Sequence, residues 1–169
     1  PHEQIAAWIG RKLNVELDRQ DVDYLIPYRC LIKLLGTPTA FRPDLIVLDR
    51  RQLSHEPLWQ TEPVVTRGAS IRLVVEVVST NWQNDYARKA EDYAILGIPE
   101  YWIADYLGLG GRDYIGKPKQ PTITICNLVG DEYQKRQFRD RDRLVSSIFP
   151  ELQLTARQIF AAANDTNSP

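Results

Sequence analysis

The sequence predicts an α/β fold that contains a βαβ unit. Residues 71–79 (IRLVVEVVS) are a near-continuous run of β-branched residues, typical of a strand buried on both faces. Residues 80–96 then switch to helical periodicity, and residues 98–105 return to strand character. A strand, a helix and a strand in this order predict a βαβ unit with parallel strands. Two later strand-like segments within residues 122–138 predict an antiparallel hairpin.

Composition narrows the class of protein. The chain has 169 residues, 43% hydrophobic and 25% charged, which is ordinary for one globular domain over residues 1–169. A net charge of −1 does not indicate a broadly basic nucleic-acid binder, so any such binding must be local. Cys30 and Cys126 lie in apolar stretches, which favours buried thiols in a reducing cytoplasm. No apolar run approaches the roughly 18 residues of a membrane span, so we expect a cytoplasmic protein without membrane contact.

The first part of the chain predicts one helix and several strands. Apolar residues at helical spacing predict a helix over residues 3–17. Because the chain starts at Pro1 and contains no methionine, residues missing from its native N-terminus would weaken that prediction. Segments rich in β-forming types predict strands over residues 22–28, 30–35 and 42–49. The next segment, 50–70, has two prolines and no clear period, so we expect a loop.

The second part predicts the βαβ unit and a C-terminal addition. The helix of residues 80–96 would be capped by Ser79 or Thr80 and would end at Gly97. A loop follows the next strand, over residues 106–121. Beyond it we expect a hairpin with a Gly-Asp turn, and then a short helix. The hairpin strands and the helix are predicted over residues 122–128, 132–138 and 154–162.

Glu76 is a charged residue in the middle of the most apolar strand. If side chains alternate, Glu76 shares one face with Arg72, Val74 and Val78. An unpaired buried carboxylate costs several kcal/mol. Glu76 therefore needs a cation or hydrogen-bond donors beside it.

Lys89 is the cation that the pattern supplies. The seam of the predicted helix consists of residues spaced by three and four, namely Trp82, Tyr86, Lys89, Tyr93 and Leu96. Four of these suit a buried contact, and Lys89 is the exception. Since the helix folds back over the preceding strand, we expect Lys89 to reach Glu76.

Asp44 follows Pro43 at the start of an apolar run. If strand 42–49 pairs with strand 71–79, Asp44 and Glu76 converge. Two carboxylates with one lysine are typical of a Mg²⁺ site, in which the lysine stabilises charge on a phosphate or orients the attacking water.

Structural roles remain open for each residue of this group. Asp44 alone suits a loop, and Glu76 alone suits an ion pair with Arg72 or Lys89. Lys89 could extend to solvent or pair with Asp85 four residues earlier. The three residues together indicate a metal site more specifically than any one of them alone.

The chain resembles the Uma2 family, also called DUF820, whose restriction-endonuclease-like proteins belong to the PD-(D/E)XK nuclease superfamily and are abundant in cyanobacteria. The resemblance extends over nearly the whole chain, from His2 to the closing FPELQLTARQIF at 149–160. Its motif residues are Pro43-Asp44, Glu76-Val77-Val78-Ser79, Asp85, Lys89, Tyr93, Gly97, Pro99-Glu100-Tyr101-Trp102-Ile103 and Asp105.

The resemblance implies a restriction-endonuclease-like αβββαβ core, in which helices flank a mixed central sheet, and a metal-dependent nuclease. Asp44 and Glu76 would be the metal ligands, with the Val77 carbonyl as a third, and Mg²⁺ the ion, for which Mn²⁺ could substitute. The superfamily lysine normally stands two residues after the glutamate, where this chain has Val78. In the Uma2 family the lysine instead lies on the following helix, which implies that Lys89 is the catalytic lysine.

Five further positions match the family more weakly. His2 would more often be solvated than catalytic, and Glu3 is a candidate auxiliary acid. Tyr93 could line the site, although core packing is the simpler role. Glu100 and Asp105 could serve only to cap or close the sheet.

The leading functional hypothesis is a Mg²⁺-dependent endonuclease that cleaves nucleic acid, with DNA as the expected substrate. Its phosphate contacts would come from two basic segments, 112–119 and 135–143, whose alternative role is solvated surface charge. The residues that we single out are Arg112, Lys117, Lys119 and Arg139. A homodimer is expected, since many relatives of this fold are dimers. The competing hypothesis is a non-catalytic binding or assembly module on the same fold.

Overall fold

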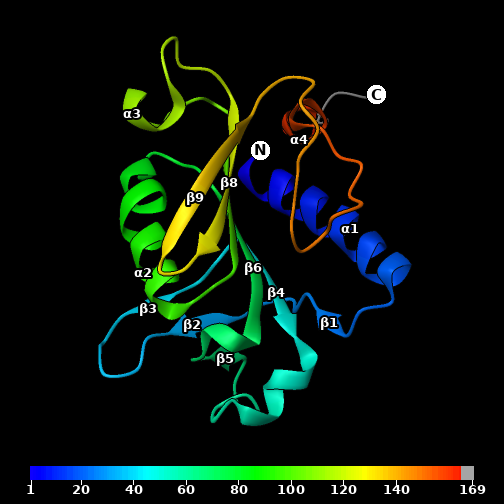
Figure 1. Ribbon diagram of the computed structural model, residues 1–169, viewed down its shortest axis with the longest axis vertical. Helices are drawn as coiled ribbons and strands as arrows, with labels where there is room; N and C mark the ends of the chain where they lie inside the picture. The colour runs from blue at the N-terminus through cyan, green and yellow to red at the C-terminus, as the bar shows by residue number, and fades with distance from the viewer. Residues whose placement is uncertain (165–169) are drawn as a thin grey trace.

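A six-stranded mixed sheet forms the centre of the molecule, with helices on both faces (Figure 1). The computed structural model describes residues 1–164. Helix α1 (His2–Gln20) covers one face, and helix α2 (Lys89–Leu96) covers the other. This arrangement confirms the predicted α/β class.

The order of the strands in the large sheet is β1-β4-β6-β7-β8-β9. Only β6 and β7 run parallel, as predicted for the βαβ unit, and the other neighbours are antiparallel. The strands are β1 (Tyr24–Leu25), β4 (Leu45–Asp49), β6 (Ile71–Val77), β7 (Glu100–Asp105), β8 (Thr122–Val129) and β9 (Glu132–Phe138). The predicted pairing of β4 with β6 is present, with Leu45 opposite Val75.

Alternating side chains of β6 divide the core into two parts. Leu73, Val75 and Val77 pack with the α1 side of the sheet, whereas Val74 and Val78 pack with the α2 side. All five are almost completely buried. The apolar run Leu73–Val78 is thus explained by burial on both faces, and Glu76 is the charged residue that interrupts it.

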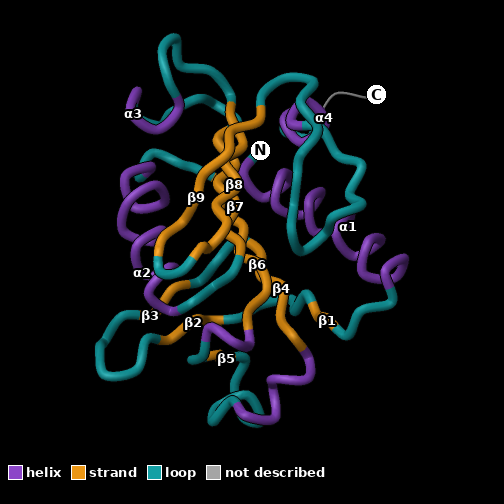
Figure 2. The backbone as a smooth tube through the Cα atoms, in the orientation of Figure 1, coloured by secondary structure: helices purple, strands orange, loops and turns teal. Residues whose placement is uncertain are grey.

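A second, three-stranded sheet lies beside the first, where its short strands are visible in Figure 2. It consists of β3 (Ala40–Phe41), β2 (Leu31–Lys33) and β5 (Val64–Val65), in that order. The strands predicted over 22–28 and 30–35 are therefore too long. β1 pairs with β4 over only two residues. β2 pairs with β3 and with β5 over two residues each, so most residues of the two predicted strands lie outside any ladder.

The segment 50–70 is more ordered than the predicted loop. It contains two 3₁₀ helices, η1 (Arg50–His55) and η2 (Gly68–Ser70), together with β5. Buried Glu56 holds it together, because its carboxylate accepts hydrogen bonds from the Thr66 and Arg67 amides and from the Ser70 hydroxyl. These bonds join residues 10 to 14 positions apart, so the segment's periodicity does not reveal them.

The helix after β6 begins later than predicted. A π-helical segment, η3 (Asn84–Arg88), precedes α2, and no side-chain cap from Ser79 or Thr80 is present. Those two residues instead lie in the connection that follows the end of β6 at Val77. Gly97 ends α2 as predicted, with a φ of 87° that favours glycine.

The C-terminal addition has the predicted elements. Gly130 and Asp131 form the two-residue turn between β8 and β9. Helix α4 (Ala156–Ala161) is shorter than predicted because Thr155 caps it in a capping box. The segment 106–121, predicted to be a loop, also contains the one-turn helix α3 (Arg112–Ile115). Within residues 1–164, no helix is both long and apolar enough to cross a membrane.

Candidate active site

A cleft of about 230 Å³ lies at the end of β6. Four separate segments form it: the start of α1, the residues before β4, the end of β6 and the beginning of the η3–α2 helix. We call it the carboxylate cleft. Its lining residues are His2, Arg42, Asp44, Glu76, Val77, Ser79, Asn81, Asn84, Asp85 and Lys89.

Asp44 is fixed in the cleft by the β4–β6 ladder. It lies immediately before Leu45, which pairs with Val75. Its Oδ2 accepts a hydrogen bond of 2.7 Å from the Val77 amide. Strand pairing therefore brings Asp44 and Glu76 to the same end of the sheet, as the sequence predicts.

Lys89 reaches Glu76 across the sheet–helix interface. Its Nζ donates to Glu76 Oε2 at 2.5 Å and to Asp85 Oδ1 at 2.9 Å. The Glu76 side chain is only 3% exposed, whereas that of Lys89 remains 23% exposed. Both pairings considered for Lys89, with Glu76 and with Asp85, are present together. Arg72 takes no part in them, because its guanidinium lies over the Tyr24 ring.

The acidic side chains of the cleft outnumber the lysine that pairs with them. Burial raises the pKa of Glu76 to about 8, although Lys89 opposes this shift. Burial likewise raises the pKa of Asp44 and of Asp85 above the ordinary range. Burial alone would lower the pKa of Lys89, but the neighbouring carboxylates outweigh it and raise that pKa, so the lysine stays charged. A divalent cation would relieve the repulsion that otherwise favours protonated carboxyls.

His2 lines the cleft and is only partly solvated, with 33% of its side chain exposed. Its Nε2 is 2.8 Å from the Val77 carbonyl oxygen and 3.5 Å from Asp44 Oδ2. Contact between the start of α1 and the end of β6 produces this placement across 75 positions of sequence. Glu3, the candidate auxiliary acid, does not line the cleft, and its side chain is 95% exposed.

The donor set of the cleft fits a hard divalent cation. Asp44 and Glu76 offer carboxylate oxygens, and Val77 offers a carbonyl that points into the cleft toward His2. Within residues 1–164, no group of three or more His, Cys, Asp and Glu side chains is arranged to hold a metal. Mg²⁺ does not require such a cage, since it commonly takes one or two carboxylates and completes its shell with water and substrate phosphate.

Comparison with known proteins identifies the family of this chain. A family model, Uma2, described as "Putative restriction endonuclease", matches residues 1–157. The chain belongs to the Uma2 family. A crystal structure from Anabaena variabilis, described as "a putative nuclease belonging to DUF820", is 16% identical, with a TM-score of 0.66 over 95% of this chain and 80% of that one. At this identity the likeness shows the fold. No curated protein matches the sequence.

Two acidic residues of the Uma2 motif have structural surroundings outside the cleft. Buried Glu100 accepts hydrogen bonds from Trp102 Nε1 at 2.8 Å and from the Ser147 amide at 2.7 Å. Buried Asp105 accepts from the Leu109 and Gly110 amides, each at 2.8 Å. Glu100 thus ties β7 to the C-terminal segment, and Asp105 fixes the glycine-rich turn after β7.

Tyr93 is mainly a core residue of this Uma2 protein. Its ring packs edge-on against the rings of Phe41 and Tyr101. Its hydroxyl reaches Glu76 Oε1 at 3.5 Å, a long hydrogen bond. Tyr93 therefore supports the base of the cleft from below.

The four basic residues predicted to contact nucleic acid do not line the cleft. Arg112, Lys117 and Lys119 are exposed on α3 and the loop after it. Arg139 is engaged structurally, since it donates to Thr122 Oγ1 at 3.1 Å and to the Ile115 carbonyl. The arginine that lines the cleft is Arg42. Its position just before Pro43-Asp44 is the sequence signal that could have identified it.

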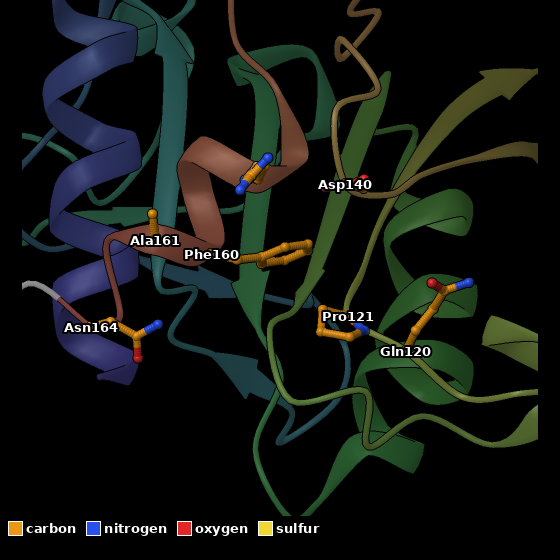
Figure 3. Close-up of a pocket in the computed structure, with 7 residues that line it drawn as sticks. Gln120, Pro121, Asp140, Phe160, Ala161 and Asn164 are labelled. Atoms are coloured by element: carbon orange, nitrogen blue, oxygen red, sulfur yellow. The ribbon is translucent and has the colours of Figure 1, made fainter.

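The cavity in Figure 3 has different chemistry. It measures about 380 Å³ and lies between α4 and the segment before β8. Asp140 and Arg157 are its only charged lining residues among those described, and Phe160 forms an apolar wall near Pro121. No carboxylate pair with a lysine is present there, so the carboxylate cleft is the better candidate for phosphodiester chemistry.

Proposed function

We propose that this Uma2 protein is a Mg²⁺-dependent endonuclease that hydrolyses phosphodiester bonds, with DNA as the substrate. Family and fold indicate a nuclease, and restriction-endonuclease-like families generally use divalent metals. The observation that carries the proposal is the meeting of Asp44, Glu76 and charged Lys89 in one cleft, whose three carboxyl groups all have pKa values raised mainly by removal from water.

Each residue has a distinct role in this proposal. Asp44, Glu76 and the Val77 carbonyl would hold the ion, which would polarise the phosphate and acidify a water molecule. Lys89 is held by Glu76 and Asp85, and its third N–H can donate a hydrogen bond to a phosphate oxygen or orient the water. The Val77 carbonyl already accepts from His2, so His2 must share that oxygen or release it when the ion binds.

Arg42 is the best-placed phosphate contact. Its side chain is exposed and lines the cleft. Arginine binds phosphate through two parallel hydrogen bonds. Arg42 would therefore suit a contact with the DNA phosphate next to the scissile phosphodiester. Arg112, Lys117, Lys119 and Arg139 stay predictions, as contacts further along the strand.

Two further parts of the proposal concern the protein's setting. Cys30 and Cys126 are free and buried, which supports a reducing, cytoplasmic location. A homodimer remains our proposal for the assembled protein. The cyanobacterial source stays a prediction.

The alternative is a non-catalytic binding or assembly module. The contacts that favour it are Lys89 with Glu76 and His2 with Val77, because they satisfy polar groups of the cleft without any metal. In that case the cluster would be a structural ion network, and divalent cations would leave the thermal stability unchanged.

The deciding experiment is cleavage of labelled single- and double-stranded DNA and RNA in Mg²⁺ and Mn²⁺. We expect wild type to cleave DNA, and Asp44→Ala and Lys89→Ala to lose at least about a hundredfold in rate, because general acid–base and metal contributions have that size. Matched controls are Asp18→Ala and Lys33→Ala, which change exposed residues outside the cleft. Wild-type inactivity on every substrate, with the fold intact, would favour the binding module.

A further inference from the structure

Strand β9 forms an open edge of the large sheet. It pairs with β8 on one side and with no described strand on the other. Figure 1 shows β9 at the near edge of the sheet. Gln134, Lys135, Arg136 and Gln137 are all exposed. An edge of this length offers a row of main-chain donors and acceptors to another strand.

The pairing within the sheet fixes which groups face that edge. The Leu128 amide donates to the Pro99 carbonyl on the β7 side, so the main chain of Leu128 turns away from its β9 partner, Tyr133. Hydrogen-bonded and non-hydrogen-bonded pairs alternate along an antiparallel ladder. The main-chain groups of Tyr133, Lys135 and Gln137 therefore point outward, toward the open edge.

This alternation restricts how β9 could pair with a second copy of itself. Two residues that face each other across an antiparallel pair either both direct their main-chain groups toward the partner strand or both direct them away from it. A two-fold axis that relates two copies of β9 must therefore lie between the two copies of one residue, so that this residue faces itself. The choice of that residue decides which side chains face each other.

An axis at Gln134 gives complementary neighbours. Glu132 then faces Arg136 of the second copy, and Tyr133 faces Lys135. An axis at Lys135 or at Arg136 would instead place two like charges directly opposite, which destabilises a strand pair. An axis at Tyr133 would leave Arg136 opposite Gly130, in the turn.

The two charged side chains of this pairing are available. Glu132 and Arg136 are exposed on the same face of β9. Among residues 1–164, neither forms an ion pair, and the Arg136 guanidinium lies over the Phe138 ring. Glu132 and Arg136 are therefore both free to pair with a partner strand.

We propose that β9 pairs antiparallel with β9 of a second copy, with the two-fold axis at Gln134, so that the sheet continues across a homodimer. Tyr133 and Lys135 of the two copies exchange main-chain hydrogen bonds, and two Glu132–Arg136 pairs fix the register. This interface is independent of the proposed nuclease activity, so either can fail without the other.

The first test is a charge swap read by sedimentation equilibrium. Glu132→Arg or Arg136→Glu alone places like charges opposite twice, because of the symmetry. We expect each to weaken dimerisation about tenfold or more, and the double variant to restore it. A monomeric wild type, a dimer insensitive to both single changes, or a double variant without recovery would overturn the proposal. Melting temperatures check that these exposed changes leave the fold intact.

The second test locates the axis by disulfide formation. Gln134→Cys would place two cysteines on the axis with Cα atoms about 4.5 Å apart, within the range that a disulfide spans. The control, Lys135→Cys, would place its two copies about 8 Å apart, too far to bridge. Native Cys30 and Cys126 are buried and do not compete. Cross-linking of the Lys135 variant, or of neither, on oxidation of the dimer would contradict this axis.

Discussion

At the residue scale, Glu76 is a buried carboxylate whose negative charge is only partly balanced by its neighbours. It lies on a strand buried from both faces, with its carboxylate next to Lys89 and with the carboxylates of Asp44 and Asp85 also in the cleft. Burial and the two acids raise its pKa, and Lys89 only partly offsets them. Without a metal, the folded protein therefore favours the protonated form of Glu76.

This shift predicts a pH-dependent stability for the metal-free protein. The pKa of Glu76 is about 8 in the folded chain, against an ordinary 4.5. The bound proton stabilises the fold fully below about pH 4.5, and that stabilisation is lost as the pH rises through 8. Glu76→Gln keeps a neutral side chain at every pH. We therefore expect thermal melts in EDTA to show the variant more stable than wild type near pH 9, with little difference near pH 5.

The opposite result would have a clear meaning. A Glu76→Gln variant less stable than wild type across the whole pH range would identify the Lys89–Glu76 contact as a structural ion pair. Asn84→Asp would serve as a comparison, since it adds a carboxyl to the same cleft and should make stability fall more steeply as the pH rises.

The sequence predicts some cleft residues and misses others for a physical reason. Glu76 and Lys89 stand out because each breaks a local pattern, one on a strand and one on a helix seam. Asp44 follows from the pairing of two recognisable strands. His2 breaks no pattern, and only the tertiary approach of α1 brings it to the cleft. Arg42 also breaks no pattern, and its place beside Pro43-Asp44 is the one local signal for it.

At the element scale, the helix after β6 differs most from simple periodicity. Residues spaced by three and four identify the buried seam correctly, since Tyr86 and Tyr93 are buried. The π-helical turn of η3, however, adds a residue to one turn, which an ideal 3.6-residue period does not anticipate. Asp85 at its start and Lys89 just after it meet across this turn. Such turns are frequent at functional sites.

The segment between β4 and β6 depends on one buried carboxylate. Glu56 accepts bonds from Thr66, Arg67 and Ser70, and Glu56→Ala would leave these donors without a partner. We expect the free energy of unfolding to fall by about 3 kcal/mol, measured by urea denaturation. Glu62→Ala, an exposed change in the same segment, should stay within about 0.5 kcal/mol of wild type. Equal effects of the two changes would show that the Glu56 network adds no stability.

At the scale of the whole molecule, the charge is nearly balanced. A formal net charge of −1 gives no general attraction to nucleic acid, so binding must depend on a few local cations. The βαβ unit and the β8–β9 hairpin follow from strong local patterns. The small second sheet and the cleft do not, because contacts between distant segments create them.

Binding of DNA through phosphate contacts predicts that affinity falls steeply as the salt concentration rises. Each phosphate contact contributes about 0.9 to the slope of log K against log salt concentration. Arg42→Ala should weaken binding of labelled DNA and reduce that slope by about 1, measured by fluorescence anisotropy in EDTA, where cleavage is suppressed. Arg11→Ala, an exposed change outside the cleft, should leave both unchanged. An unaltered slope in the Arg42 variant would remove this arginine from the phosphate contacts.

The start of α1 and the β4–β6 ladder support the cleft separately. His2 contacts the Val77 carbonyl at 2.8 Å from the helix side, whereas Asp44 is held by the Val77 amide and by the pairing of β4 with β6. Displacing His2 from that oxygen would leave the Asp44–Val77 bond and the strand pairing intact. An ion that bound the Val77 carbonyl would therefore replace one side chain of the cleft without any rearrangement of the sheet.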